Sequence, residues 1–407
     1  MDKIDWRTKG IWWPGPPVTP AEFAAARHDL FGGAFTWPVL VADGAAIAHN
    51  IDTLAAFCAR HGLEFAPHGK TTMAPSLFEA QLRAGACAIT VATANQVLAC
   101  RALGVPAVLL ANELVDPGPL RWVAQEVERG FDFLCYADSL AGVRAMSSAV
   151  ASVPGDRPLR VLVELGHPGG RTGCRTPQEL AEVARAVIAA PRLTLAGVAG
   201  YEGGLPDAPA VAAYLDGLRA AVRDLADEGL LPDPVIVTAG GSKYFDLVAS
   251  KLAGSWLPGY QLRTILRSGA YISHDDGTYR EQTPFRRVPG EGALEAALEI
   301  WAQVTSTPEK GLAIVGMGKR EAPYDEGLPV PRKIRGLDGT ARAADGLRVT
   351  AINDHHAYVE VPPDVELVPG ELVAFGISHP CTAFDKWQVI PVVDPAYKVI
   401  DLIHTHF

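Results

Sequence analysis

One lysine in this sequence stands where a reactive amine would be useful. The stretch Pro67-His68-Gly69-Lys70 follows the apolar run Leu63-Glu64-Phe65-Ala66 and precedes a helical segment that begins near Ala74. In a barrel of parallel strands, active sites lie at the carboxyl ends of the strands, which is where this lysine would sit. An amine held there against apolar walls loses its preference for the charged form. It can then form a Schiff base with a carbonyl substrate or with pyridoxal phosphate.

The elements that would position this lysine alternate between strand and helix. Helix-periodic segments, for example 45–60, 177–190 and 208–228, separate short β-type runs. This alternation predicts right-handed crossovers and a parallel sheet. Eight units over about 230 residues favour a (β/α)8 barrel over a doubly wound sheet, and a count of six or seven strands stays open. The predicted strands are residues 63–70, 88–93, 107–111, 132–138, 159–166, 195–203, 234–240 and 264–271.

The pattern changes after about residue 285, where short β-rich runs are joined by Gly/Pro turns. This predicts a C-terminal all-β domain. Its predicted strands are Ala297–Val304, Gly311–Val315, Leu347–Ile352, Ala357–Val361, Glu371–Phe375 and Gln388–Val393. The predicted organisation is an N-terminal arm (1–40) that packs on the β domain or on a partner subunit, a barrel (41–280) and the β domain (281–407).

Polar and glycine-rich residues follow most of the barrel strands. Glycines paired with hydroxyls after strands seven and eight suit a phosphate, because their N–H groups approach closely and a helix begins after Ser242. Strands one and eight are neighbours in a closed barrel, so Lys70 would face the loops that follow strands seven and eight. Each motif alone is ordinarily a turn or a solvated side chain, but together they predict a seat for a phosphorylated aldehyde. The residues are His68, Lys70, Thr93, Asn95, Gln96, Gly166–Gly173 with Arg171, Tyr201–Gly204, Thr238–Ser242 and Arg267–Tyr271.

A second cluster, His379-Pro380-Cys381, lies in the predicted β domain. Side chains two apart on an extended segment point the same way, so both can reach one ion. Imidazole with thiolate favours zinc, and two protein ligands would leave positions open for water or substrate. The alternative is a buried cysteine beside a hydrogen-bonded histidine. Asp354-His355-His356 could add further polar groups or be structural.

Composition limits the classes of function. The chain has 407 residues, is 48% hydrophobic and 20% charged, and carries a net charge of −10, so we expect a large folded core and no nucleic-acid partner. Its six cysteines are widely spread, which is typical of free thiols in a reducing compartment. No signal-peptide pattern and no apolar run of membrane-spanning length is evident. We therefore expect a cytoplasmic protein without a membrane partner.

These residues resemble the D-threonine aldolase and D-serine dehydratase group of the alanine-racemase-like (fold type III) pyridoxal-phosphate enzymes. The resemblance covers nearly the whole chain. It implies that Pro-His-Gly-Lys-Thr carries the cofactor on Lys70, that Arg171 lies near the cofactor ring, and that His379 and Cys381 bind a divalent metal. The metal is expected to be zinc, with manganese or magnesium as alternatives. The predicted cofactor-binding residues are Lys70, His68, Gln96, Arg171, Tyr201, Thr238, Gly240, Gly241, Ser242, Gly269, Ala270 and Tyr271.

The chain departs from the group's pattern at Thr71-Thr72-Met73, where many members carry Thr-His-Lys. With the long segment from His379 to Trp387, this resembles the cryptic D-serine deaminase branch. The resemblance implies a homodimeric lyase for a D-β-hydroxy amino acid, with Lys70 as catalytic base. Dehydration to ammonia and a 2-oxo acid is favoured, and retro-aldol cleavage is the alternative. A racemase, a non-catalytic pyridoxal-phosphate protein and a cofactor-free metal hydrolase stay open.

Overall fold

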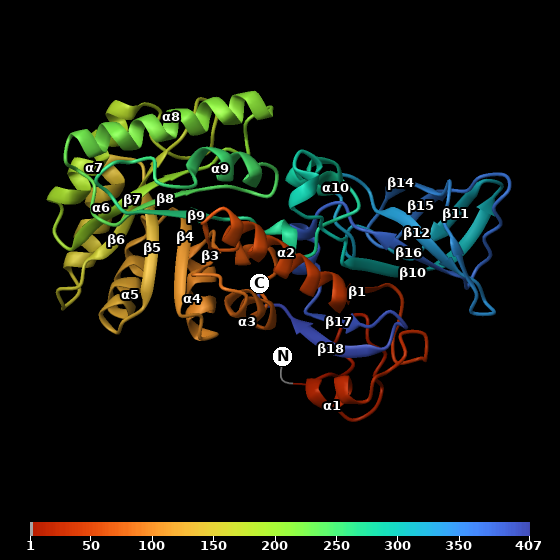
Figure 1. Cartoon of the computed structure of the whole chain (residues 1–407). Helices are drawn as coiled ribbons and strands as arrows, with labels where there is room; N and C mark the ends of the chain where they lie inside the picture. The colour runs from red at the N-terminus through yellow and green to blue at the C-terminus, as the bar shows by residue number, and fades with distance from the viewer. Residues whose placement is uncertain (1–2) are drawn as a thin grey trace.

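The computed structural model describes residues 3–407, which form a parallel barrel and an antiparallel β domain (Figure 1). The barrel strands are hydrogen-bonded in the order β2-β9-β8-β7-β6-β5-β4-β3. The two ends of this order meet, because Thr90 N donates to Pro67 O (2.8 Å) and His68 pairs with Thr90 in a parallel bridge. The predicted fold class is thereby confirmed.

All eight predicted barrel strands are present. They are β2 (Glu64–Phe65), β3 (Ile89–Val91), β4 (Ala107–Glu113), β5 (Asp132–Ala137), β6 (Leu159–Leu165), β7 (Leu193–Gly200), β8 (Val235–Ala239) and β9 (Leu262–Leu266). The helices around them are α2 (Gly44–Arg60), α3 (Pro75–Arg83), α4 (Ala94–Ala102), α5 (Pro117–Glu128), α6 (Leu140–Ala151), α7 (Pro177–Ala189), α8 (Ala208–Asp227) and α9 (Phe245–Leu252).

Helix α7 shows how the sequence specifies these outer elements. Thr176 caps the helix by accepting a hydrogen bond from Glu179 N, and the Glu179 carboxylate accepts one from Thr176 N in return. Pro177 fits the first turn, where its missing N–H costs no hydrogen bond. Leu180, Val183, Ala184 and Val187 follow at helical spacing and are buried, so one face of the helix packs on the barrel.

The second sheet forms the β domain and takes one strand from the start of the chain. β1 (Val39–Asp43) lies between β10 (Leu298–Glu309), to which it is antiparallel, and β17 (Val389–Val393), to which it is parallel. The remaining strands are β11 (Leu312–Val315), β12 (Val330–Arg335), β13 (Ala341–Ala343), β14 (Arg348–Ile352), β15 (Ala357–Glu360), β16 (Leu372–Gly376) and β18 (Val399–His404). Four strands of this sheet, β1, β12, β13 and β18, were not among the predicted ones. Charged residues interrupt the apolar pattern of β12, and β13 is short and exposed.

The segment before β1 packs on the β domain through one apolar cluster. Ile4, Phe23 from α1 (Pro20–Ala25) and Leu30 are buried together with Trp301 and Leu402 of the β domain. Figure 1 shows this segment beside β17 and β18, at the edge of the β domain below the barrel.

Short helical elements lie after β2, between β9 and β10, and between β16 and β17, and they carry several residues discussed below. They are η1 (Gly69–Thr71), η2 (Ala270–Ile272), α10 (Thr278–Gln282), η3 (Pro284–Arg286), η4 (Pro289–Glu291), η5 (Pro380–Thr382) and η6 (Phe384–Lys386). No helix among residues 3–407 is long and apolar enough to cross a membrane.

Replacing Phe23 by alanine should lower the free energy of unfolding by about 3–5 kcal/mol, because the ring is 1% exposed and its removal leaves a cavity. Urea denaturation of the two proteins measures the difference. Leu98→Ala is the control, since Leu98 lies on α4, is 48% exposed and should cost about 0.5 kcal/mol or less. Equal losses in the two variants would mean that the N-terminal segment does not contribute to the core.

Candidate active site

The barrel interior changes from apolar to polar at the carboxyl ends of its strands. Successive side chains of a strand point to opposite faces, so residues two apart share a face. The apolar inner residues Ala66, Leu134, Leu162, Ile236 and Ile265 are each followed two positions later by His68, Tyr136, Glu164, Thr238 and Arg267. We call these five the polar layer. The alternation alone therefore gives the mouth of the barrel a set of polar side chains.

Lys70 lies at this mouth on the turn η1, directly after β2. Gly69 allows the turn to pack tightly, because a Cβ there would lie 2.5 Å from Ile89 Cγ2 and 2.8 Å from Phe78 Cε1. A larger residue would push the turn away from β3 and α3. The position of Lys70 thus depends on a glycine before it.

His68 lies beside Lys70 and has one ring nitrogen without a partner among the described residues. Its Nδ1 is buried and makes no hydrogen bond within residues 3–407. Burial, followed by the positive charges of Lys70 and Arg267, lowers the pKa of His68 well below its ordinary value. The imidazole is therefore neutral and can donate to or accept from a bound group.

The loops after β8 and β9 meet next to this turn. Ser242 Oγ accepts from Ala270 N (3.2 Å) and lies 3.3 Å from Ser268 Oγ. His68 N donates to Ser268 O (3.0 Å), and a Cβ on Gly269 would lie 2.8 Å from both His68 Cβ and Thr71 Oγ1. Lys70, His68, Ser242, Gly269 and Ala270 are therefore brought together.

Gly240 and Gly241 lie in the same loop, but their amides already have a partner. Gly240 N and Gly241 N donate to the two carboxylate oxygens of Glu202 (3.0 and 2.9 Å). Glu202 is fully buried behind the loop, and burial raises its pKa although these two bonds oppose the shift. Glu202 was predicted only as part of the range Tyr201–Gly204 at the mouth. The structure gives it the role of holding the loop from behind.

Three other predicted residues also have protein partners. Thr238 Oγ1 donates to Ile265 O (2.9 Å) and so joins β8 to β9. Tyr271 Oη accepts from Gln81 Nε2 (2.7 Å) in the layer between barrel and helices. Gln96 Oε1 accepts from Ala92 N (2.9 Å) at the start of α4. Their polar atoms support the loops around Lys70.

Tyr201 and Arg171 form a stacked pair. The guanidinium carbon of Arg171 lies 4.6 Å from the centre of the Tyr201 ring. The ring also limits Gly241, because a Cβ there would lie 3.2 Å from Tyr201 Cε2. Burial, followed by the charge of Glu202, raises the pKa of Tyr201, so its hydroxyl stays protonated.

The β domain brings the His-Cys pair to the same mouth. Cys381 Sγ lies 3.3 Å from Thr71 Oγ1, one residue from Lys70. His379 Nδ1 bonds to Asp325 Oδ2 (2.6 Å), and Thr382 Oγ1 donates to Asp325 Oδ1 (2.7 Å). Burial lowers the pKa of His379, but hydrogen bonds to Cys381 and Asp325 outweigh this and raise it to about 9.

Two neighbours of this pair were not predicted. Asp325 lies in a loop without strand or helix period, so only the structure reveals its contact with His379. Tyr279 on α10 has its ring centre 6.2 Å from that of His379. Within residues 3–407, no third His, Cys, Asp or Glu side chain completes a metal-binding group.

One member of the polar layer, Glu164, is paired with a second carboxyl group. Glu113 ends β4 and faces Glu164 near the end of β6, with Asp138 close by. Burial, and then the charges of Glu164 and Asp138, raise the pKa of Glu113 to about 8. Such a pair holds one proton at neutral pH, because two facing carboxylates repel each other.

Comparison with known proteins identifies the family. Residues 42–256, more than half of the chain, match the family Alanine racemase, N-terminal domain. The chain belongs to this alanine racemase family. Residues 297–393 match a second family, described as Putative serine dehydratase domain. The predicted family is confirmed, and it implies pyridoxal phosphate as cofactor.

Curated relatives of this alanine racemase-like chain are similar over most of their length. The 3-hydroxy-D-aspartate aldolase of Paracoccus denitrificans (strain Pd 1222) is 26% identical over 82% of this chain and 84% of the relative. The D-threonine aldolase of an Arthrobacter species is 26% identical over 95% of this chain and 94% of the relative. The D-threo-3-hydroxyaspartate dehydratase of Delftia sp. (strain HT23) is 28% identical over 78% of this chain and 82% of the relative.

Solved structures share the fold. The D-threonine aldolase of Filomicrobium marinum superposes with a TM-score of 0.78 at 23% identity, covering 91% of this chain and 95% of that one. A cysteine variant of D-threo-3-hydroxyaspartate dehydratase in the metal-free form gives a TM-score of 0.70 at 21% identity, covering 91% and 97%.

Glu113 should make the stability of the protein depend on pH. An unfolded glutamate has a pKa of about 4.3, so protonated Glu113 stabilises the folded state fully below that pH and loses this effect as the pH rises toward 8. Glu113→Gln stays uncharged. Relative to this variant, the free energy of unfolding of the native protein should fall by up to about 1.4 kcal/mol per pH unit between about pH 5 and 8.

Urea denaturation at several pH values between about 5 and 9 measures this difference. Glu182→Gln, on the exposed face of α7, is the matched control and should leave the pH dependence unchanged. A stability difference between Glu113→Gln and the native protein that is constant over this range would contradict the shared proton.

Proposed function

We propose that this chain is a pyridoxal-phosphate- and divalent-metal-dependent lyase that converts a D-β-hydroxy amino acid to ammonia and a 2-oxo acid. The observation that carries the proposal is the 3.3 Å contact between Thr71 Oγ1 and Cys381 Sγ. It brings a potential metal pair next to the turn of Lys70. The curated relatives, two aldolases and one dehydratase for D-hydroxy amino acids, support this substrate class.

The residues at the mouth suit pyridoxal phosphate. The buried Nδ1 of His68, which has no hydrogen-bond partner within residues 3–407, and the glycine positions that a Cβ would fill are features of a site built for a bound group. Lys70 would bind the aldehyde carbon of the cofactor, and the loops that contain Ser242 and Gly269-Ala270 would bind its phosphate. Tyr201 and Arg171 would contact its ring. When bound, the cofactor supplies an electron sink that stabilises negative charge at the α-carbon of an amino acid. Gln96, Thr238, Gly240, Gly241 and Tyr271 support this site.

His379 and Cys381 suit a divalent ion. An imidazole and a thiol are zinc-type donors, whereas manganese and magnesium prefer oxygen. Asp325 occupies Nδ1 of His379, which is the usual way to orient a metal-binding imidazole and leaves Nε2 for the ion. The ion supplies Lewis-acid chemistry toward a hydroxyl group.

Lys70 is the proposed base for the α-proton. Its amine lies on the turn that contacts Cys381, so a substrate α-carbon near Lys70 has its β-hydroxyl near the His-Cys pair. Removal of the α-proton by Lys70 and departure of the β-hydroxyl would release water and leave an enamine, and hydrolysis of this enamine by water would give the 2-oxo acid and ammonia.

Retro-aldol cleavage is the second candidate, favoured by the aldolase names of two relatives. In that reaction a base removes the hydroxyl proton instead, and the Cα–Cβ bond breaks to give glycine and an aldehyde. The same residues serve both outcomes. We also propose that the enzyme is a homodimer, as the family resemblance implies, and that it is cytoplasmic, as its widely spread free cysteines indicate.

Incubation with D-serine, D-threonine and D-threo-3-hydroxyaspartate, with ammonia and glycine measured separately, tests the proposal. Ammonia with a 2-oxo acid is expected, and glycine with an aldehyde would indicate the aldolase. Lys70→Ala should lower turnover by roughly 10²–10⁴-fold or more, because a positioned base is lost. Lys310→Ala, in the exposed turn between β10 and β11, is the control. Full activity of Lys70→Ala would rule out its catalytic role.

Removal of divalent metal by a chelator should abolish turnover while the cofactor absorbance persists, because Lys70, and not the His-Cys pair, would hold the cofactor. Zinc added after the chelator has been removed should restore activity. Turnover that is unchanged by chelation would rule out the metal-dependent lyase mechanism.

A further inference from the structure

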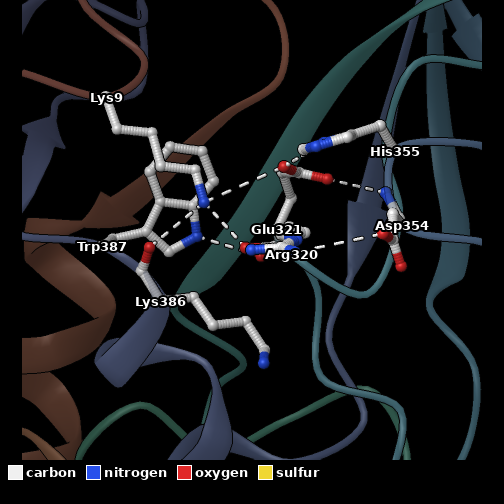
Figure 2. Close-up of polar contacts among 8 residues, drawn as sticks. Lys9, Arg320, Glu321, Asp354, His355, Lys386 and Trp387 are labelled. Carbon is white, nitrogen blue, oxygen red and sulfur yellow. Dashed lines mark hydrogen bonds and ion pairs between the residues drawn. The ribbon is translucent and has the colours of Figure 1, made fainter.

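Lys9, in the N-terminal segment, contacts residues of the β domain (Figure 2). Its Nζ donates to the carbonyl oxygens of Arg320 (2.7 Å) and Lys386 (3.2 Å). The ammonium lies 4.2 Å from the centre of the Trp387 ring and 3.9 Å from Glu321 Oε1. One side chain thus contacts two loops that are far apart in sequence.

Each of these two loops carries part of the proposed metal site. The first, residues 318–325, which we call the Asp325 loop, contains Arg320 and ends at the carboxylate that holds His379. The second, residues 379–387, which we call the His-Cys segment, contains both proposed ligands and Lys386. Lys9 therefore joins the loop that orients the imidazole to the segment that carries it.

Buried Glu321 reinforces the bridge. Its carboxylate accepts from Gly318 N (2.9 Å) and lies 2.9 Å from His355 Nδ1, and its carbonyl accepts from Trp387 Nε1 (3.0 Å). The Glu321 side chain is only 4% exposed, so the ammonium of Lys9 offsets a charge that would be costly to bury alone. His355, considered in the sequence as a further polar group near the metal, belongs to this cluster.

Gly10, the residue after Lys9, packs closely against Trp387 and Val39. Gly10 has φ +84°, and a Cβ on it would lie 3.0 Å from both Trp387 Cζ3 and Val39 Cγ2. Any other residue would be strained and would press on the tryptophan beneath the ammonium. The N-terminal segment is thus seated on the His-Cys segment, and Lys9 does not simply extend toward it through solvent.

We propose that Lys9 is a positioning residue for the metal site, which fixes the spacing between the Asp325 loop and the His-Cys segment through its bonds to the two carbonyl groups. This inference rests on the proposed function, because it requires that His379 and Cys381 bind a divalent ion. Lys9 itself contacts neither proposed ligand. Its effect is on how well the imidazole is held toward the ion.

The test is the affinity for zinc of the cofactor-loaded enzyme after its metal has been removed, measured by competition with a chelator of known affinity. Lys9→Met keeps the length and the contact with Trp387 but loses both hydrogen bonds. Its zinc affinity should be about tenfold weaker, the usual effect of removing a group that orients a metal ligand. Lys9→Arg can still donate to the carbonyl groups and should stay within about threefold of the native protein. Lys310→Met is the matched control.

Thermal unfolding separates positioning from general stabilisation. If Lys9 acts on the metal site, the rise in melting temperature caused by zinc is smaller in Lys9→Met than in the native protein. A residue that only anchors the N-terminal segment would lower the melting temperature equally with and without zinc. Lys9→Gln, which retains one donor, serves the same comparison if the methionine variant does not fold, and its affinity should lie between those of Lys9→Met and the native protein.

Two results overturn different statements. Native protein that binds zinc, together with Lys9→Met of equal affinity, would overturn the role of Lys9 and leave the proposed function intact. Native protein that binds no divalent metal would overturn the metal-dependent function itself, and the inference with it.

Discussion

The contact of the β domain with the barrel mouth is the constraint on which the site depends. Neither part contains the whole set of groups, because Lys70 follows a barrel strand and Cys381 follows a strand of the β domain. The segment between them is anchored where it crosses, since Asp276 N donates to Ile377 O (2.9 Å) and Arg332 pairs with the Asp276 carboxylate. Any shift between the two parts would separate the amine from the thiol, so the geometry of the site is a property of their interface.

Ionisable side chains lie on both sides of the barrel mouth, with basic groups on one side and acidic groups on the other. His68 and Arg267 lie on neighbouring strands, whereas Glu164 and Glu113 lie on strands farther round the barrel. Buried charges are tolerated only when they are paired or neutralised. The imidazole of His68 is neutral and the carboxyl group of Glu113 is protonated, so neither carries a charge. The guanidinium of Arg267 is charged and donates a hydrogen bond to the Gly200 carbonyl. The protonation states of the site are thus set by burial as much as by individual contacts.

The sequence was sufficient to predict the barrel and much of the mouth. Apolar runs alternating with helix-periodic segments define eight strands, and the parallel order then brings Lys70, Ser242 and Gly269 to one end. Side-chain direction in the turns beyond the strands was not predictable, as Tyr271 illustrates, because one residue of register decides whether a group faces the mouth or the helices. The contacts of Asp325 and Glu202 were also hidden. They join distant segments, and neither lies in a periodic pattern that would indicate a partner.

The place of β1 between β10 and β17 has a consequence for how the chain folds as it is synthesised. The barrel is formed by one continuous stretch, so it can fold before the rest of the chain has left the ribosome. β1 emerges early, but its two neighbours emerge only after residues 309 and 393. Until then its backbone N–H and C=O groups are unpaired, and such strand edges are prone to associate with other chains. Contacts of such long sequence separation form slowly. The nascent protein therefore carries an exposed strand for most of its synthesis, a natural substrate for chaperones.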